Sequence, residues 1–208
     1  MYDYIFFSDI YYYTSTLIGL ILISITVVYP KNSKLVRYIS VSFVFFLMLL
    51  LFIRPITNNM SFPDTAMYAS WFNYAKQNNE IEKFKDVGFD LILLFLAKIG
   101  NLRFFFIVIT TINFALIFLI GKKISKEYYY IFIVLSTGSV YSFTLLTSLL
   151  RQELAILFII FSLLFDKKNI KYSLMIIAIL FHKSVLLLAI PILILDIFSI
   201  RLDRKSVV

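Results

Sequence analysis

Long uncharged segments alternate with short polar ones along most of the chain. The uncharged or nearly uncharged segments are Tyr11–Tyr29, Tyr38–Ile53, Phe104–Gly121, Tyr128–Leu150, Leu154–Phe165, Tyr172–Phe181 and Ser184–Ile200. A helix needs about 20 apolar residues to cross a bilayer. The pattern therefore predicts an all-α protein, a polytopic transmembrane helical bundle with about 6–7 membrane segments.

The segment Tyr172–Phe181 is too short to cross a bilayer alone. Its ten residues make about 15 Å of helix, against a hydrocarbon core of about 30 Å. One tilted helix over Tyr172–Phe198 is the alternative. We expect a broken pair at His182 and Lys183 instead, because irregular backbone at membrane depth is tolerated where it lines a cavity.

Residues 57–103 differ from the rest of the chain. Acidic and basic side chains are balanced over Thr57–Val87, and Gly88–Gly100 is a short apolar run between two glycines. We interpret 57–103 as an outer-face loop with amphipathic helices, of which the second is interfacial or re-entrant. The whole chain, 1–208, is predicted to be a single integral membrane domain.

Basic residues gather in four clusters, and these predict the topology. The clusters are Lys31, Lys34 and Arg37; Lys122, Lys123 and Lys126; Lys167, Lys168 and Lys171; and Arg201, Arg204 and Lys205. The positive-inside rule places them in the cytoplasm. The N-terminus, with Asp3 and Asp9, then lies outside, together with Thr57–Val87 and the Arg151 region. The net charge of +8 needs no nucleic-acid partner.

Composition agrees with a membrane protein and narrows the chemistry. Apolar residues make up 61% of the chain, charged residues 15%, and the mean hydropathy is +0.91. A soluble domain is about 25% charged, so a soluble enzyme or a DNA-binding module is excluded. The chain has no cysteine and one histidine, which excludes thiolate chemistry and multi-histidine metal sites. We expect neither a metal nor a cofactor.

Arg151 is the strongest candidate for a site residue, because ionisable groups within apolar segments are costly. Polar side chains spaced by four, three, four and three residues lead to it: Thr137, Tyr141, Thr144, Ser148 and Arg151. This spacing predicts a single polar helix face, and the guanidinium fork fits phosphate oxygens. The alternative is that Arg151 marks a helix end at the outer interface, with Glu153 in water.

Two further groups are candidates. His182 and Lys183, followed by Ser184, fit an anionic head group; alternatively, Lys183 extends to the interface and His182 bonds to a backbone carbonyl. Arg54 closes the second segment. Asp64 is either the cap of a helix over Asp64–Lys76, or a general base or a contact to the acceptor sugar, with Tyr68 one turn further on.

Read in order, these motifs resemble a known family. They are Arg54, Asp64-x-x-x-Tyr68, Val87-Gly88-Phe89, Leu150-Arg151-Gln152-Glu153-Leu154-Ala155 and Leu180-Phe181-His182-Lys183-Ser184. The series resembles the EpsG-like branch of the Wzy-type polymerases, which make O-antigen, capsule or exopolysaccharide.

The resemblance implies a multi-pass protein of the bacterial cytoplasmic membrane with glycosyltransferase-type activity. Such a polymerase joins oligosaccharide repeat units carried on undecaprenyl pyrophosphate at the outer face. Its implied partners are the lipid-linked oligosaccharide, membrane lipids, a chain-length regulator and a flippase. The alternatives are a flippase or export component, and a non-catalytic fragment or accessory subunit of such a system.

Matching positions carry the family's roles onto this chain. Arg151 and Arg54 would bind the pyrophosphate, and His182 would assist at the phosphate or activate the acceptor hydroxyl, with Asp64 as the rival base. From the polar stripe and the segments around Asp64 and His182, rather than from the family, we expect the remaining substrate contacts to come from Tyr68, Tyr141, Ser148, Lys183 and Ser184.

The chain departs from the family pattern in two places. Val87 stands where the family often has an acid, although Asp86 and Asp90 are adjacent. The family also continues with further helices after its histidine element, so we expect this chain to be truncated at its C-terminus.

Overall fold

The computed structural model describes residues 2–28, 33–56, 63–81 and 85–205, and these are all helical or irregular. The helices are α1 (Tyr2–Val28), α2 (Ser33–Phe52), α3 (Pro63–Asn78), α4 (Val87–Ile99), α5 (Leu102–Ile124), α6 (Tyr129–Thr137), α7 (Val140–Thr147), α8 (Leu150–Leu163), α9 (Lys168–Phe181) and α10 (Leu186–Lys205), with a 3-10 turn, η1, over Lys183–Val185. The all-α prediction is confirmed for these residues.

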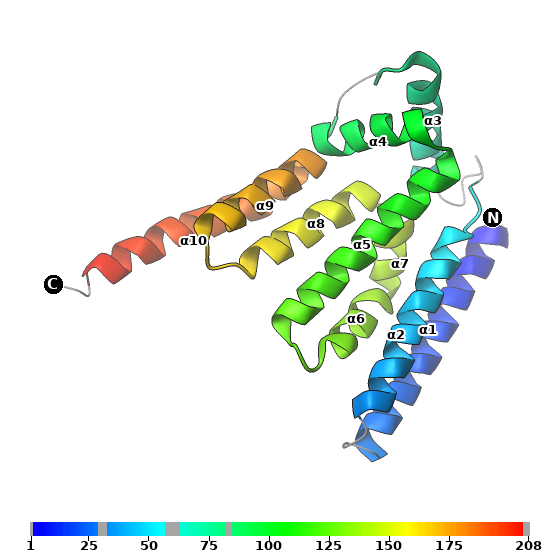
Figure 1. The fold of residues 1–208 in the computed structure, drawn as a ribbon, viewed down its shortest axis with the longest axis horizontal. Coiled ribbons are helices and arrows are strands. Elements are labelled where there is room, and N and C mark those ends of the chain that lie inside the picture. Colours follow the sequence, from blue (N-terminus) through cyan, green and yellow to red (C-terminus); the bar gives the residue numbers. More distant parts are fainter. Residues whose placement is uncertain (1, 29–32, 57–62, 82–84, 206–208) are drawn as a thin grey trace.

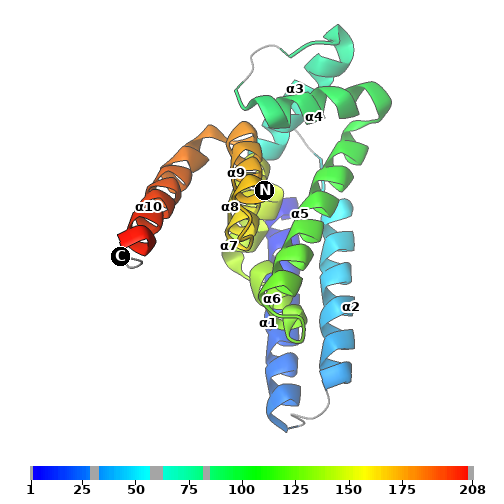
Figure 2. The same cartoon turned by 60° about the vertical axis from the view of Figure 1, so that its left-hand side comes forward.

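The helices form an open bundle with α3 and α4 laid across one end (Figure 1). Helices α1 and α2 run side by side, α5 packs against α2, α6 and α8, and α9 returns along α8 to reach α4. Figure 2 shows α10 leaving η1 and diverging from α8 and α9. The start of α2, the α5–α6 connection and the α8–α9 loop all lie away from α3 and α4. The described residues of three basic clusters therefore lie away from the α3–α4 end, whereas Lys31 is outside the described residues.

Two helices of the described residues are long and apolar enough by themselves to cross a membrane. They cover Lys34–Phe52 and Leu102–Ile124. The count of 6–7 membrane segments stays a prediction.

The expected single helix over Tyr128–Leu150 is wrong. Helix α6 ends at Thr137, and Ser139 begins α7 as an N-cap whose hydroxyl accepts from the Ser142 amide. Ser148 then ends α7, so α8 is a separate helix. Serine hydroxyls compete with the helical ladder for backbone groups, which favours such breaks. The polar stripe leading to Arg151 is consequently divided among three helices rather than lying on one face.

The break at His182 is confirmed. Helix α9 ends at Phe181, and His182 is extended, with φ −160° and ψ 113°. The chain then makes one 3-10 turn before α10 begins at Leu186. The break places the His182 ring and the Lys183 amide beside the start of α4.

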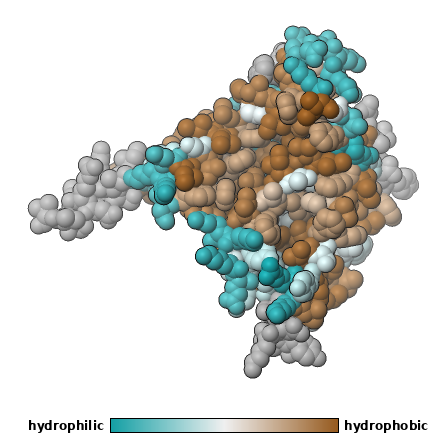
Figure 3. Space-filling view, in the orientation of Figure 1, coloured by the Kyte–Doolittle hydropathy of each residue, from teal (hydrophilic) through white to brown (hydrophobic). Residues whose placement is uncertain are grey.

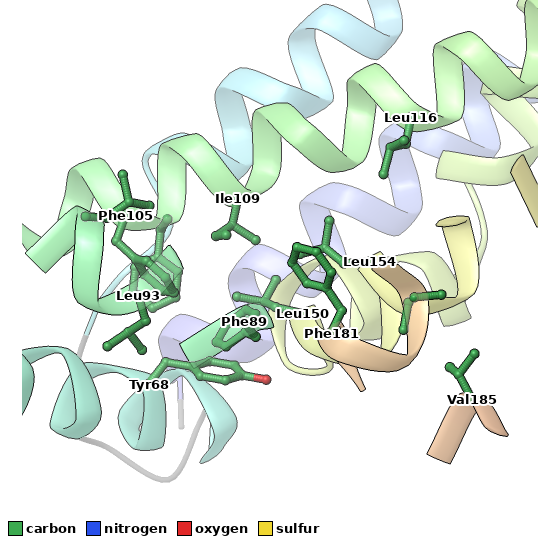
Figure 4. Close-up of a cluster of buried hydrophobic side chains, with 14 of the residues drawn as sticks. Tyr68, Phe89, Leu93, Phe105, Ile109, Leu116, Leu150, Leu154, Phe181 and Val185 are labelled. Atoms are coloured by element: carbon green, nitrogen blue, oxygen red, sulfur yellow. The ribbon is translucent and has the colours of Figure 1, made fainter. Parts of the chain in front are cut away.

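Two hydrophobic cores hold the bundle together. The α4 core joins α3, α4, α5, α8 and α9, and Figure 4 shows Tyr68 beside Phe89 and Leu150 in it. The α2 core joins α1, α2, α5, α6 and α7 around Tyr11, Leu47 and Phe143. Helix α5 contributes to both, so it fixes the α3–α4 end relative to α1 and α2.

Large apolar side chains remain exposed over much of the bundle. On α4 they are Val87, Leu91, Phe95 and Ile99, and on α10 they include Leu186, Leu187, Leu188, Ile190 and Leu195. Figure 3 shows a broad hydrophobic surface with hydrophilic residues at its borders. A soluble monomer rarely exposes apolar patches beyond a few hundred Å². The surface is that of a protein whose helices face lipid.

Gly88 lets α4 approach α9 closely, and this allows a prediction. A Cβ at Gly88 would lie 3.1 Å from the carbonyl carbon and oxygen of Leu180. Because that neighbour is backbone, Gly88→Ala should push α4 from α9 and cost about 1–3 kcal/mol, seen as a lower Tm of the detergent-solubilised protein. Gly19→Ala is the control, since a Cβ there meets no atom within 4 Å. Equal Tm values for the two variants would contradict the close packing.

Candidate functional site

The carboxylate of Asp86 is the centre of a charged group at the α3–α4 end. Its Oδ2 accepts from Arg151 Nη1 at 2.5 Å and lies 3.0 Å from His182 Nδ1. Its Oδ1 accepts from the Lys183 backbone amide at 3.1 Å. The side chain of Asp86 is only 2% exposed. Three segments far apart in sequence, at 86, 151 and 182–183, thus meet at one buried carboxylate.

Local backbone structure fixes this carboxylate. Asp86 occupies the N-cap position of α4 in extended conformation. One turn later, Oδ2 of Asp90 accepts from the amides of Lys85, at 2.8 Å, and Asp86, at 3.1 Å. Amides at a helix start lack partners within the helix, and an acid in the first turn suits the positive end of the helix dipole. The chain entering α4 is therefore held in place.

Aromatic rings of α3 form a wall beside the cations. The Arg151 guanidinium lies 5.0 Å from the Trp71 ring centre and 5.9 Å from that of Tyr68. Lys85 Nζ lies 4.9 Å from the Trp71 ring centre. Cations are attracted to aromatic faces at these distances. Burial raises the pKa of the Tyr68 hydroxyl, and its interaction with Arg151 partly opposes that rise.

Asp64 lies at the edge of this group. It is the second residue of α3, which begins at Pro63, so the expected helix over Asp64–Lys76 begins one residue too late and Asp64 is not its cap. A first-turn acid is still favourable there. Burial raises the pKa of the Asp64 carboxyl, and the nearby Arg151 partly offsets this. The structure therefore brings Asp64, Tyr68, Arg151 and His182 to one place.

The raised pKa of Asp64 gives a pH-dependent prediction. When the pKa of an acid is higher in the folded than in the unfolded protein, folding becomes less favourable as the pH rises from the unfolded-state pKa, about 3.9 for aspartate, through the folded-state pKa. Asp64→Asn removes this loss. The Tm of the variant minus that of the wild type should therefore grow as the pH rises above about 3.9 and level off once the pH has passed the raised pKa of the folded-state carboxyl. A difference that does not change with pH would contradict the burial of the charge.

Arg54 belongs to a second, deeper group. Its side chain is 1% exposed, and Nη1 donates to the Leu146 carbonyl at 2.8 Å. The guanidinium carbon lies 4.3 Å from the Phe106 ring centre. Carbonyls in the last turn of a helix lack partners within it, and Leu146 is in the last turn of α7. Arg54 thus supports the α7–α8 break and does not touch Asp86.

Glu153 completes this deeper group. It is 5% exposed and accepts from Asn113 Nδ2 at 2.8 Å, and its charge interacts with that of Arg54. Of the alternative interpretation of Arg151, one half is confirmed, because Arg151 stands in the first turn of α8 and so marks a helix end. The other half is wrong, because the helix turns Glu153 into the bundle rather than into water. Asn113 joins α5 to α8, as an intramembrane polar residue tends to do.

The remaining predicted residues are placed less centrally. Lys183 and Ser184 have exposed side chains, and Ser148 is partly buried at the end of α7. The side chain of Tyr141 lies outside the described residues. Among the described residues, no group of three or more His, Asp or Glu side chains is placed to hold a metal ion.

The sequence reasoning missed Asp86, Trp71 and Lys85. A signal for Asp86 was present, because an acid directly before Val87-Gly88-Phe89 stands one position from where the family often has one. Because Val87 occupies the position where the family often has an acid, Asp86 was not recognised as the equivalent acid. Helix α4 starts at Val87, so the acid one position earlier is the N-cap and faces the α8 and α9 residues.

The fold and this group of residues define a class: a helical membrane protein with a charged, aromatic-walled site at one end of the bundle. The chain belongs to the EpsG family, whose model matches residues 41–208. The family resemblance is thereby confirmed, and it indicates a membrane protein of polysaccharide biosynthesis. Searches of curated proteins and of solved structures each found no match.

Proposed function

We propose that this chain is a membrane glycan polymerase that joins repeat units carried on undecaprenyl pyrophosphate. The reaction takes place at the α3–α4 end, at the outer face of the bacterial cytoplasmic membrane, with the N-terminus also outside. Membership of the EpsG family supports the proposal. The single observation that carries it is the meeting of Arg151, His182 and the Lys183 amide at Asp86.

This arrangement suits glycosyl transfer from a pyrophosphate. The acceptor hydroxyl gives its proton to His182 as its oxygen bonds to the anomeric carbon of the donor chain. The bond from that carbon to the pyrophosphate oxygen breaks, and the electron pair leaves with the pyrophosphate. A base with its proton-accepting atom in reach and a cation at the leaving oxygen are the two requirements. Asp64 is the second candidate for the base.

Arg151 has donors available for the leaving group. Only Nη1 is engaged with Asp86, and the Arg151 side chain is 15% exposed. A guanidinium presents five N–H donors in a planar fork, so it can bind a phosphate oxygen while keeping its contact with Asp86. Tyr68 lies beside the Arg151 guanidinium, and Lys183 and Ser184 directly follow His182 in the chain, so we assign the further substrate contacts to these three residues.

A length profile of surface polysaccharide tests the proposal. Cells whose only copy is this 208-residue chain are compared on a gel with cells lacking it. A ladder of long chains that needs the protein supports the polymerase. Single repeat units in both lanes, with the protein inserted and stable, would contradict it and favour an accessory subunit of a flippase or export system.

A further inference from the structure

The contact between Asp86 and His182 determines which imidazole nitrogen is free. His182 Nδ1 lies 3.0 Å from Asp86 Oδ2. An ionised carboxylate only accepts hydrogen bonds, and Asp86 pairs with the Arg151 cation. Nδ1 must then be the donor. In the neutral ring, Nε2 consequently carries no proton and is the atom that can accept one.

The Asp86 carboxylate is held so that it cannot easily turn away. Oδ2 contacts both Arg151 and His182, and Oδ1 accepts from Lys183 N. Its own amide is bonded to Asp90. The Lys183 amide donates to the same carboxylate, so the backbone directly after His182 is fixed as well. The ring is therefore restrained both through Nδ1 and through the backbone that carries it.

We propose that Asp86 is a positioning residue that fixes His182 as the Nδ1–H tautomer and directs unprotonated Nε2 to the acceptor hydroxyl. The inference rests on the proposed polymerase function for its catalytic consequence. The physical principle is the one by which a buried carboxylate holds a catalytic imidazole in the correct tautomer and stabilises the imidazolium that forms. Arg151 on the same carboxylate then couples the base to the group that stabilises the leaving pyrophosphate.

The chain offers a direct readout, because His182 is its only histidine. Nitrogen-15 NMR of the full chain in detergent, with labelled histidine, reports which ring nitrogen is protonated. The spectrum is taken at about pH 9, well above the usual histidine pKa of about 6.5. We expect one tautomer, protonated at Nδ1. A wild-type ring protonated at Nε2, or an even mixture, overturns the proposal without any variant.

Asp86→Asn tests the role of the carboxylate. Asparagine has one oxygen and one NH2 group in place of two oxygens. Its NH2 group would therefore face other donors, either the Lys183 amide or Arg151 and His182. The single tautomer should become a mixture, and the transfer rate at saturating lipid-linked unit should fall by about 10²–10⁴-fold, with KM changed only a few-fold. Asp196→Asn is the matched control, since Asp196 pairs with Lys171 at 2.6 Å and should leave both readouts at wild-type values.

The outcomes separate the two proposals. An Asp86→Asn protein that keeps a pure Nδ1–H signal, or that loses affinity but not rate, overturns the positioning role. If the wild-type chain shows the fixed tautomer but makes no polymer, the Asp86–His182 pairing stands and only the proposed polymerase function is overturned.

Discussion

Replacing Arg151 with alanine is expected to abolish the ladder of long polysaccharide chains while the amount of inserted protein stays near the wild-type level. The Arg151 side chain is 15% exposed, and its guanidinium contacts Asp86 and lies beside the Trp71 and Tyr68 rings. Loss of one donor to a developing anion costs about 10²–10³-fold in rate, and here the cation is removed with it. The measurement is the length distribution on a gel beside an immunoblot of the membrane fraction.

Two further variants test whether the loss is specific to the guanidinium of Arg151. Arg151→Lys keeps the charge but loses the planar fork, so it should restore only short chains. Arg37→Ala removes an arginine at the basic end of α2, where it lies 5.4 Å from the Tyr129 ring centre, and should keep the full ladder. A normal ladder in Arg151→Ala would place the chemistry elsewhere in the molecule.

Replacing Arg54 with leucine is expected to have the largest effect on stability. The substitution leaves the buried Leu146 carbonyl without its side-chain donor and removes the guanidinium from the face of the Phe106 ring. An unsatisfied buried carbonyl costs about 1–3 kcal/mol, and a desolvated cation–aromatic contact contributes about 2 kcal/mol more. The prediction is a large fall in both the Tm and the amount of folded protein in the membrane.

Arg103 provides the comparison for Arg54. Its Nη1 donates to the carbonyls of Phe52 and Arg54, but its side chain is exposed. Water can replace these bonds, so Arg103→Leu should cost about 1 kcal/mol. If the two variants lose equal stability, the buried group around Arg54 is not what holds the α7–α8 break.

Most of the helical pattern was readable from the sequence because burial in lipid requires it. Uncharged segments of about 20 residues have few alternatives to helix in a bilayer. The break at His182 was also expected, since Tyr172–Phe181 is too short to cross and irregular backbone at membrane depth is tolerated where it lines a cavity. The break within Tyr128–Leu150 was missed, because hydropathy does not register a serine that caps a helix.

Some residues of the candidate site could also be predicted from the sequence, and others could not. Arg151, His182 and Asp64 were visible as polar residues in costly places, and family motifs put Tyr68 beside them. Arg54 was visible too, but the structure buries it against α7 rather than beside the Asp86 carboxylate. No spacing rule distinguishes these outcomes, because they depend on how α3 and α8 pack.

By itself, the sequence determined that this is a helical membrane protein with cationic and aromatic residues at intervals along it, since hydropathy and charge are local properties. Only the tertiary structure decided that Asp86 is the residue on which they meet. A carboxylate between Lys85 and Val87 looks like part of a polar loop until α4 and α9 pack at Gly88. That packing brings residues 86, 151 and 182 within hydrogen-bonding distance, and contacts between segments so far apart in sequence depend on the fold as a whole.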